Sequence, residues 1–247
     1  MGPITKPALP ETSAAPHWLA CERRGVYALL MAASGMMGAY TLVLRGGVFC
    51  NAQTANIAMM AVAFGQARWG DGLYYLIPIT AYCLGAFLSE LLPGPVKRLG
   101  PVRWDTCLVL LEAAALFCIG LIPLQAPHQP VQVLINFIAA MQFNTFRQAE
   151  GIPMATTFCT NHVRQVGVWL CHGVRRRDPA AFRRAGVHLA MLAGFFAGAA
   201  LLAGLCPLLQ AKAIWLALAP LLAAAARLLY ADLIAERGLL PRKPAGH

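Results

Sequence analysis

Amide and hydroxyl side chains gather in two short stretches of an otherwise apolar sequence. These stretches are NAQTAN at residues 51–56 and ATTFCTNH at residues 155–162, and each leads directly into a mainly apolar run. Such groups can bind a small polar solute through hydrogen bonds, and they can equally cap a helix start or satisfy buried backbone groups. The candidate solute-binding residues in the two stretches are Asn51, Gln53, Thr54, Asn56, Thr157, Thr160 and Asn161.

A carboxylate and two amides outside these stretches are also candidate solute-binding residues. Glu112 lies near the middle of the apolar run DTCLVLLEAAALFCIGLI, where an ionised side chain costs several kcal/mol in a membrane. It is therefore expected to stay protonated or to have a partner. One interpretation is proton coupling or solute contact, and the other is a hydrogen bond to a neighbouring helix. Gln142 and Asn144, in MQFNTFRQAEG, fit either interhelical hydrogen bonds or solute binding.

Three charged residues near these candidates have their own expected roles. Arg147 and Glu150, three residues apart near a helix end, are expected to form an intrahelical pair. Arg164 follows Thr160 by about one turn and is expected to neutralise Glu112, attract an anion or extend to the membrane surface.

The composition indicates that most of the chain lies in a membrane. Hydrophobic residues make up 59% of the sequence and charged residues only 12%, against about 25% charged in globular proteins. The net charge of +10 comes largely from basic residues at the ends of apolar runs, which fits lipid headgroups better than nucleic acid. His162, His172, His188 and the eight cysteines show no metal-ligand spacing, so neither a metal nor another cofactor is predicted.

Six apolar segments are long enough to cross a bilayer, and two polar-headed segments are not. The six lie at about 26–44, 72–92, 104–124, 130–147, 186–206 and 211–230. The other two, about 51–68 and 154–172, continue as mainly apolar sequence for only about 14 residues, where about 20 are needed. The sequence therefore predicts an all-α polytopic membrane protein with six full spans and two re-entrant or broken half-helix segments. Eight short spans are the alternative.

The distribution of basic residues favours the six-span arrangement. With eight spans, Lys97, Arg98 and Arg103 would face outside, against the positive-inside tendency. With two re-entrant segments, the amino terminus, the 93–103 loop, the 173–184 loop and the carboxyl terminus all face the cytoplasm. One membrane domain at 25–232 is then flanked by cytoplasmic tails at 1–24 and 233–247, the first of them disordered.

The six-span layout is compatible with an inverted 3+3 repeat, with halves at about 25–125 and 130–232. The two polar segments then enter the membrane from opposite faces. Thr54 and Asn56 are expected to lie near Thr160 and Asn161 at the midplane, where such proteins bind their solutes.

Small residues on two apolar segments predict close helix packing. They are Gly35, Gly38 and Ala39 on the first span, and Gly194 and Gly198, which form a GxxxG pattern, on the fifth. The same pattern also supports self-association into a homo-oligomer.

Two regions resemble the signature motifs of a known family. RGGVFCNAQTANI at 45–57 and MQFNTFRQAEGIPMATTFCTNHVRQ at 141–165 are similar to those of the YoaK family, and the resemblance covers residues 25–230. The family usually has glycine where this chain has Ala55 and Asn161, so any role that needs a bare backbone there is not carried over. The resemblance implies an integral protein of the bacterial cytoplasmic (inner) membrane, sometimes described as a predicted permease, with no established substrate.

The predicted function is a transporter or channel for a small polar or anionic solute. The anion is suggested because a helix amino terminus carries partial positive charge and free N–H donors. A non-transporting membrane protein that organises a partner or senses a ligand, through the basic 175–184 loop, is the alternative. An enzyme is not expected, because the sequence shows no nucleophile with a base, no metal cluster and no paired carboxylates. The lipid bilayer and the solute are the expected partners.

Overall fold

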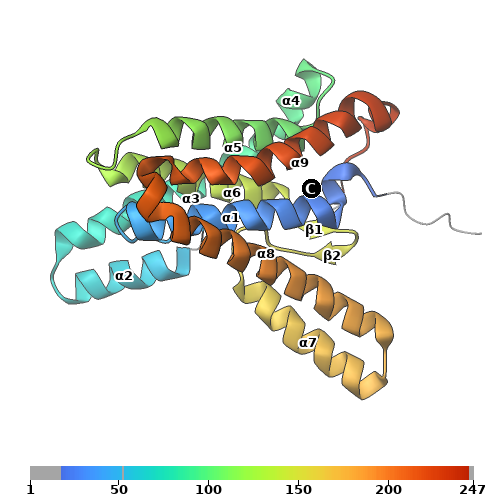
Figure 1. Cartoon of the computed structure of the whole chain (residues 1–247), viewed down its shortest axis with the longest axis horizontal. Coiled ribbons are helices and arrows are strands. Elements are labelled where there is room, and N and C mark those ends of the chain that lie inside the picture. The colour runs from blue at the N-terminus through green and yellow to red at the C-terminus, as the bar shows by residue number, and fades with distance from the viewer. Residues whose placement is uncertain (1–17, 52, 245–247) are drawn as a thin grey trace, which may run out of the picture.

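Nearly all regular elements of the protein are helices (Figure 1). The computed structural model describes residues 18–51 and 53–244. The α-helices are α1 (Arg24–Leu44), α2 (Gln53–Gly65), α3 (Trp69–Leu91), α4 (Pro93–Leu99), α5 (Trp104–Leu121), α6 (His128–Thr145), α7 (Thr160–Arg176), α8 (Pro179–Leu209) and α9 (Leu218–Tyr230). Shorter 3-10 or π segments are η1 (Ala20–Glu22), η2 (Gln210–Ala217), η3 (Ala231–Ala235) and η4 (Arg237–Leu239). An antiparallel pair of short strands, β1 (Gln148–Ala149) and β2 (Ile152–Pro153), follows α6.

Five of the expected spans coincide with α1, α3, α5, α6 and α8, and the last is divided between η2 and α9. α8 begins earlier than expected. Pro179 occupies the first turn of α8, and the Asp178 carboxylate caps the helix by accepting a hydrogen bond from the Ala180 amide at 2.8 Å. Arg177 ends α7 with a positive φ of 50°. The basic 175–184 segment is therefore a tight helical turn and not an extended loop.

The helices pack in pairs that bring the two halves of the chain together. α1 runs along α8, α3 along α6, and α5 along α9. α2 folds back against α3, and α7 against α8, so that each pair is a hairpin. The two hairpins point to opposite ends of the molecule, the α2–α3 tip to the left and the α7–α8 tip to the lower right (Figure 1).

Glycines allow the closest of these helix crossings. A Cβ on Gly35 of α1 would overlap the carbonyl oxygen of Phe195 on α8, and a Cβ on Gly198 would overlap that of Ala32 on α1. Gly85 of α3 meets Phe137 of α6 in the same way. The GxxxG glycine Gly198 is thus used within the chain, where small residues let two backbones approach.

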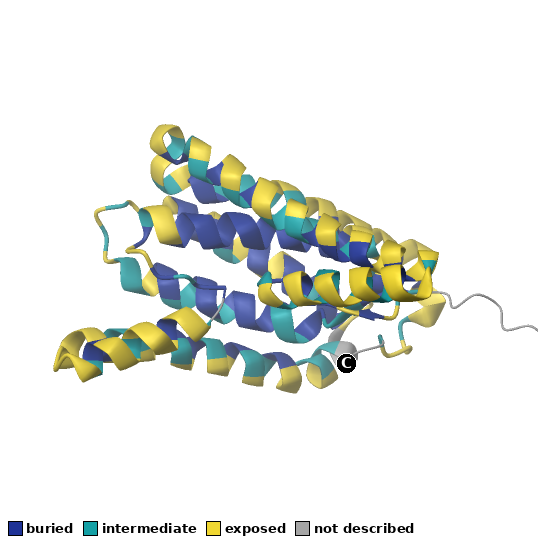
Figure 2. Ribbon diagram, turned by 90° about the horizontal axis from the view of Figure 1, so that it is seen from below, coloured by how far each residue is buried: buried dark blue, intermediate teal, exposed yellow. Residues whose placement is uncertain are grey.

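The described residues include helices that are apolar and long enough to cross a membrane. By length and composition these are Arg24–Leu44, Trp69–Leu91, Trp104–Leu121 and the Pro179–Ala235 region, which holds α8, η2 and α9. Exposed residues follow the outward faces of the helices (Figure 2). Large apolar side chains are among them, for example Leu42, Val62, Phe87, Leu121, Phe196 and Leu208. Outward-facing apolar helices identify a helical membrane protein.

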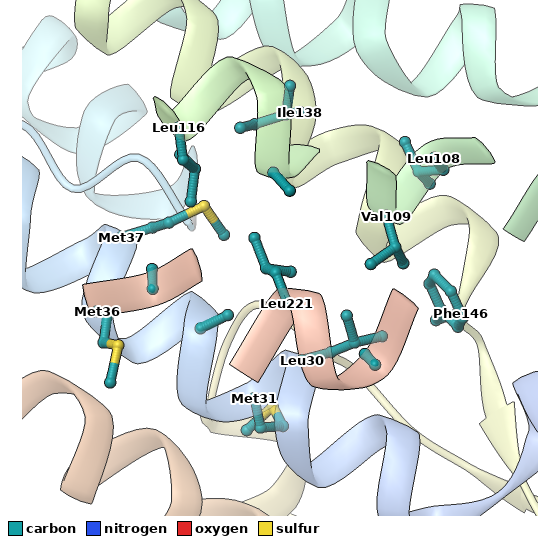
Figure 3. Close-up of a cluster of buried hydrophobic side chains, with 14 of the residues drawn as sticks. Leu30, Met31, Met36, Met37, Leu108, Val109, Leu116, Ile138, Phe146 and Leu221 are labelled. Carbon is teal, nitrogen blue, oxygen red and sulfur yellow. The ribbon is translucent and has the colours of Figure 1, made fainter. Parts of the chain in front are cut away.

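The apolar core lies between α1, α5, α6 and α9. Figure 3 shows Leu30 and Met37 of α1 facing a cluster that includes Leu116 of α5, Ile138 of α6 and Leu221 of α9. All five side chains are essentially inaccessible to solvent. The polar candidate residues on these helices therefore lie in an apolar surrounding with little access to water.

A buried ionic cluster ties the two ends of the chain together. The Arg103 guanidinium donates to Asp232 at 2.9 Å and to Glu236 at 2.7 Å, and all three side chains are buried. Glu236 also accepts from the Ala20 amide at 2.8 Å. Residues 18–24 were expected to belong to a disordered tail, but Ala20 contacts the carboxyl-terminal segment and Arg24 pairs with Glu150 in the turn between β1 and β2. The remainder of that tail, residues 1–17, lies outside the described residues, as do residues 245–247 of the other.

Candidate functional site

The first polar stretch forms the turn before α2 and its first helical turn. The Asn51 side-chain amide donates to the backbone oxygen of Ser34 at 2.6 Å, which anchors the turn on α1. Gln53 donates to Asn136 of α6 at 2.7 Å, and Asn56 donates to Gln53 at 3.0 Å. Asn51 and Asn56 are buried. These amides therefore connect the start of α2 to two other helices.

The amide chain continues along α6 to α3. Asn136 donates to the backbone oxygen of Gln132 at 2.7 Å, and the Gln132 side chain donates to the backbone oxygen of Arg45 at 2.6 Å. Tyr74 of α3 donates its hydroxyl hydrogen to Gln132 at 2.6 Å. Gln132 and Asn136 are not among the site residues predicted from the sequence. Two amides four residues apart in an apolar segment were the available signal, because that spacing places both on one helix face.

The second polar stretch reaches the same residue of α1 as the first. Gln142 of α6 donates to the Ser34 hydroxyl at 3.0 Å and to the backbone oxygen of Thr156 at 3.4 Å. Gln142, Thr156 and the neighbouring Thr157 are fully buried. Ser34 therefore joins the turn before α2, through Asn51, to the segment before α7, through Gln142. Ser34 was missed because a lone serine in an apolar segment carries no motif.

No contact joins Thr54 or Asn56 to Thr160 or Asn161 in the described part of the chain, although a meeting of these residues was predicted. Thr54 and Thr160 are exposed, because each lies on the outward side of its helix start. Asn161 is partly exposed and accepts a hydrogen bond from Arg164 at 3.0 Å, one turn further along α7. The polar stretches thus converge through the residues just before the two helices and not through their first turns.

Glu112 is buried in the middle of α5 without a hydrogen-bond partner among the described residues. Its exposure is 0%, and both carboxylate oxygens are enclosed. Arg164, one of the partners considered from the sequence, is exposed and donates to Asn161 instead. An ionised carboxylate in this surrounding would be costly, so Glu112 is either protonated or accompanied by a cation.

Asn144 lies apart from Ser34, in a polar cluster between the ends of α3 and α6. It donates to Ser89 at 2.8 Å and to Glu90 at 3.0 Å, and Glu90 pairs with Arg147 at 2.6 Å. The expected Arg147–Glu150 pair is wrong, since Glu150 pairs with Arg24 at 2.9 Å. The reason is that α6 ends at Thr145, so the two residues do not share a helix.

Two histidines far apart in the sequence meet where α7 packs against α8. The Nδ1 atoms of His162 and His188 lie 3.0 Å apart, and His162 Nε2 lies 2.7 Å from the backbone oxygen of Ala155. Both rings are fully buried. Within the described residues, no group of three or more His, Cys, Asp or Glu side chains is arranged to hold a metal ion. The pair links the segment before α7 to α8.

Burial also affects a thiol outside the membrane helices. Cys21 of η1 is buried, and burial together with the nearby Asp105 carboxylate raises the pKa of the Cys21 thiol well above its usual range. The neutral thiol, which is a poor nucleophile, is therefore the form present near neutral pH.

Apolar helices with a buried polar centre define the protein as an integral membrane protein of the helical class. Residues 26–227 match the family described as protein of unknown function (DUF1275), and the chain belongs to that family. The YoaK resemblance is confirmed, because YoaK proteins are members of it. No curated protein and no solved structure matches the chain.

Proposed function

We propose that the chain is a transporter or channel for a small polar solute, with its site at the middle of the membrane. The observation that carries the proposal is the connection of both polar segments to Ser34, the first directly through Asn51 and the second through Gln142 of α6, which also bonds to Thr156. Ser34 is the midpoint of α1, which runs from Arg24 to Leu44, and it contacts Asn51 and Gln142. Amides that only joined neighbouring helices would not need to bring two distant, non-helical segments to one point.

The length of α2 and the position of Trp169 on α7 support a midplane start for both helices. α2 has 13 residues, which cover about 20 Å at about 1.5 Å per residue, too short for an apolar core of about 30 Å. Trp169, with Arg184 stacked 4.5 Å from its ring centre, is the kind of residue found at a membrane surface. α7 begins at Thr160, about 14 Å before Trp169. Each helix therefore starts at about half depth, as a half-helix and not as one of eight spans.

The helix pairing supports an inverted repeat of two halves. Apart from the seven-residue α4, the first half contains α1, α2, α3 and α5 in order, and the second contains α6, α7, α8 and α9. The first helix of each half packs on the third helix of the other, since α1 lies on α8 and α6 on α3. The fourth helices, α5 and α9, pack on each other. Reciprocal packing of this kind is expected from a twofold relation between the halves. In this arrangement six helices cross the membrane, and α2 and α7 enter it without crossing.

The basic residues support a cytoplasmic position for the end that carries both termini. Contacts there join η1, the start of α5 and η3, and the end of α3 lines a cleft of about 480 Å³ with the carboxyl-terminal segment. The positive-inside tendency assigns this end to the cytoplasm of a bacterial inner-membrane protein. The α2–α3 tip then lies outside.

A solute screen tests the proposed function. The purified protein is heated with a panel of amino acids, sugars, polyols and small anions, and solutes that raise the unfolding temperature are then tested for uptake into proteoliposomes. Gln142→Leu should remove both the stabilisation and the uptake. Gln125→Leu, an amide replacement at an exposed loop position, is the matched control and should retain them. Absence of both stabilisation and uptake for every solute would favour the non-transporting alternative.

A further inference from the structure

The buried polar atoms around Ser34 that lack partners are oxygens. The Asn51 amide group faces the Ser34 carbonyl oxygen, which can only accept, so the orientation of this side chain is fixed and its Oδ1 atom remains free. Gln142 is fixed in the same way by the Thr156 carbonyl oxygen, which leaves its Oε1 atom free. The Thr156 hydroxyl is also buried without a partner among the described residues. Two amide oxygens and a hydroxyl without partners among the described residues therefore belong to side chains that are linked through Ser34 and Gln142.

Glu112 belongs to the same layer of the core. Leu30 and Met37 lie one turn to either side of Ser34 on α1, and Val109 and Leu116 lie one turn to either side of Glu112 on α5. Figure 3 shows all four labelled side chains directed into one cluster, with Met37 beside Leu116. Leu30 lies on the side of Val109 and Met37 on the side of Leu116, so α1 and α5 run in the same direction and Ser34 and Glu112 lie at the same level. Glu112 lies on the same face of α5 as Val109 and Leu116, and both of its carboxylate oxygens are buried without a partner among the described residues.

We infer that this layer is a binding site for a monovalent alkali cation, with Glu112 supplying the charge and Asn51, Gln142 and Thr156 supplying neutral oxygens. Hard cations prefer oxygen ligands of these types. One carboxylate and one monovalent ion cancel, whereas a divalent ion would leave a surplus positive charge in an apolar core. An anion is disfavoured because the free atoms are acceptors and the nearby side-chain charge is negative.

Among the described residues packed around α5, no charged side chain is seen to neutralise Glu112 in place of the cation. α5 packs against α4, α6, α9 and η2, and the titratable groups on these elements and at the ends of α5 lie towards the helix ends. On η2 and α6, Lys212 stacks on Trp215 and His128 lies beside Gly46. On α9, Arg227 lies against Gly25 and Tyr230 is exposed. The remaining described groups are Arg103, Asp105, Asp232 and Glu236 in the buried ionic region, and the sequence of α4 adds Lys97 and Arg98. A proton is then the natural competitor for the carboxylate, so cation binding should weaken as the pH falls.

The inference rests on the site of the proposed function, and it names the ion that the site would hold and exchange for a proton. The test measures ion binding without any solute. Purified protein in choline chloride is titrated with NaCl, LiCl or KCl at constant ionic strength, and the unfolding temperature is recorded at several pH values. We expect a saturable rise with at least one alkali cation, and an apparent Kd that increases about tenfold per pH unit once the carboxyl is protonated.

Variants separate a specific site from a general salt effect. Glu112→Gln should abolish the saturable rise, and Gln142→Ala should weaken it about tenfold. Asp71→Asn, which changes an exposed carboxylate paired with Arg68, should leave it unchanged. If Glu112→Gln fails to fold, the Gln142→Ala titration decides. A wild-type protein without a saturable rise, or variants that retain it in full, would overturn the inference.

The outcome is distinguishable from failure of the proposed function. Solute uptake that proceeds in choline buffer, with no cation-dependent stabilisation, would leave the transporter proposal standing and refute the cation site. Saturable, Glu112-dependent cation binding without uptake of any solute would support the site and refute the solute transporter.

Discussion

Replacing Arg103 with methionine should destabilise the protein by about 3–5 kcal/mol, because it would leave two buried carboxylates without their cation. The Arg103 side chain is only 6% exposed, and Asp232 and Glu236 are 2% and 8% exposed. Its guanidinium group also donates to the backbone oxygen of Leu239 at 3.0 Å. Each of these bonds is made away from bulk water, so solvent screening does little to reduce the loss.

Unfolding in mixed micelles of a mild and a denaturing detergent measures this change in free energy. Arg68→Met is the matched control, since Arg68 and Asp71 form an ion pair at 2.6 Å with both side chains half exposed or more, and such pairs contribute about 1 kcal/mol or less. The variant Arg103→Met/Asp232→Asn/Glu236→Gln removes all three charges and should recover much of the stability. An Arg103→Met protein as stable as Arg68→Met would refute the view that the cluster is a buried, charge-balanced anchor.

Three other outcomes are expected from the packing, the orientation and the thiol environment. Gly198→Leu should destabilise the protein by about 3 kcal/mol or more, since the added side chain would force α1 away from α8. Gly204→Leu is the control for the same micelle assay and should have little effect, because an added Cβ there meets nothing within 4 Å. A reporter fused after Arg98 should be cytoplasmic and one inserted after Ala67 periplasmic, and a periplasmic signal after Arg98 would contradict the six-crossing arrangement. Because burial raises the pKa of its thiol, Cys21 should not react with a thiol reagent at pH 8 in the folded protein, but should react after denaturation. Rapid labelling of the native protein would show that η1 is not packed.

The sequence could predict where the polar segments begin, but not which atoms they would contact. Asn51 and Gln142 are recognisable because an amide in an apolar run needs a partner in a membrane. Their shared partner, Ser34, depends on the way α1 passes between the two segments. The outward orientation of Thr54 and Thr160 depends on the rotation of each helix about its axis. A one-residue shift in a helix start turns each side chain by about 100°, and local sequence does not fix such a shift.

Composition and segment length determined the membrane class, the helices and the burial of Glu112, because these follow from the cost of placing polar groups in lipid. Tertiary structure alone decided the pairings between distant residues. Arg147 bonds to Glu90, and His162 meets His188, because helices from different parts of the chain bring them together. Contacts of this kind depend on helix crossings set by the shapes of glycine faces and not by any spacing along the chain. The sequence therefore contained the polar groups of the candidate site, and the packing of α1, α5 and α6 decided which of their oxygens remained free.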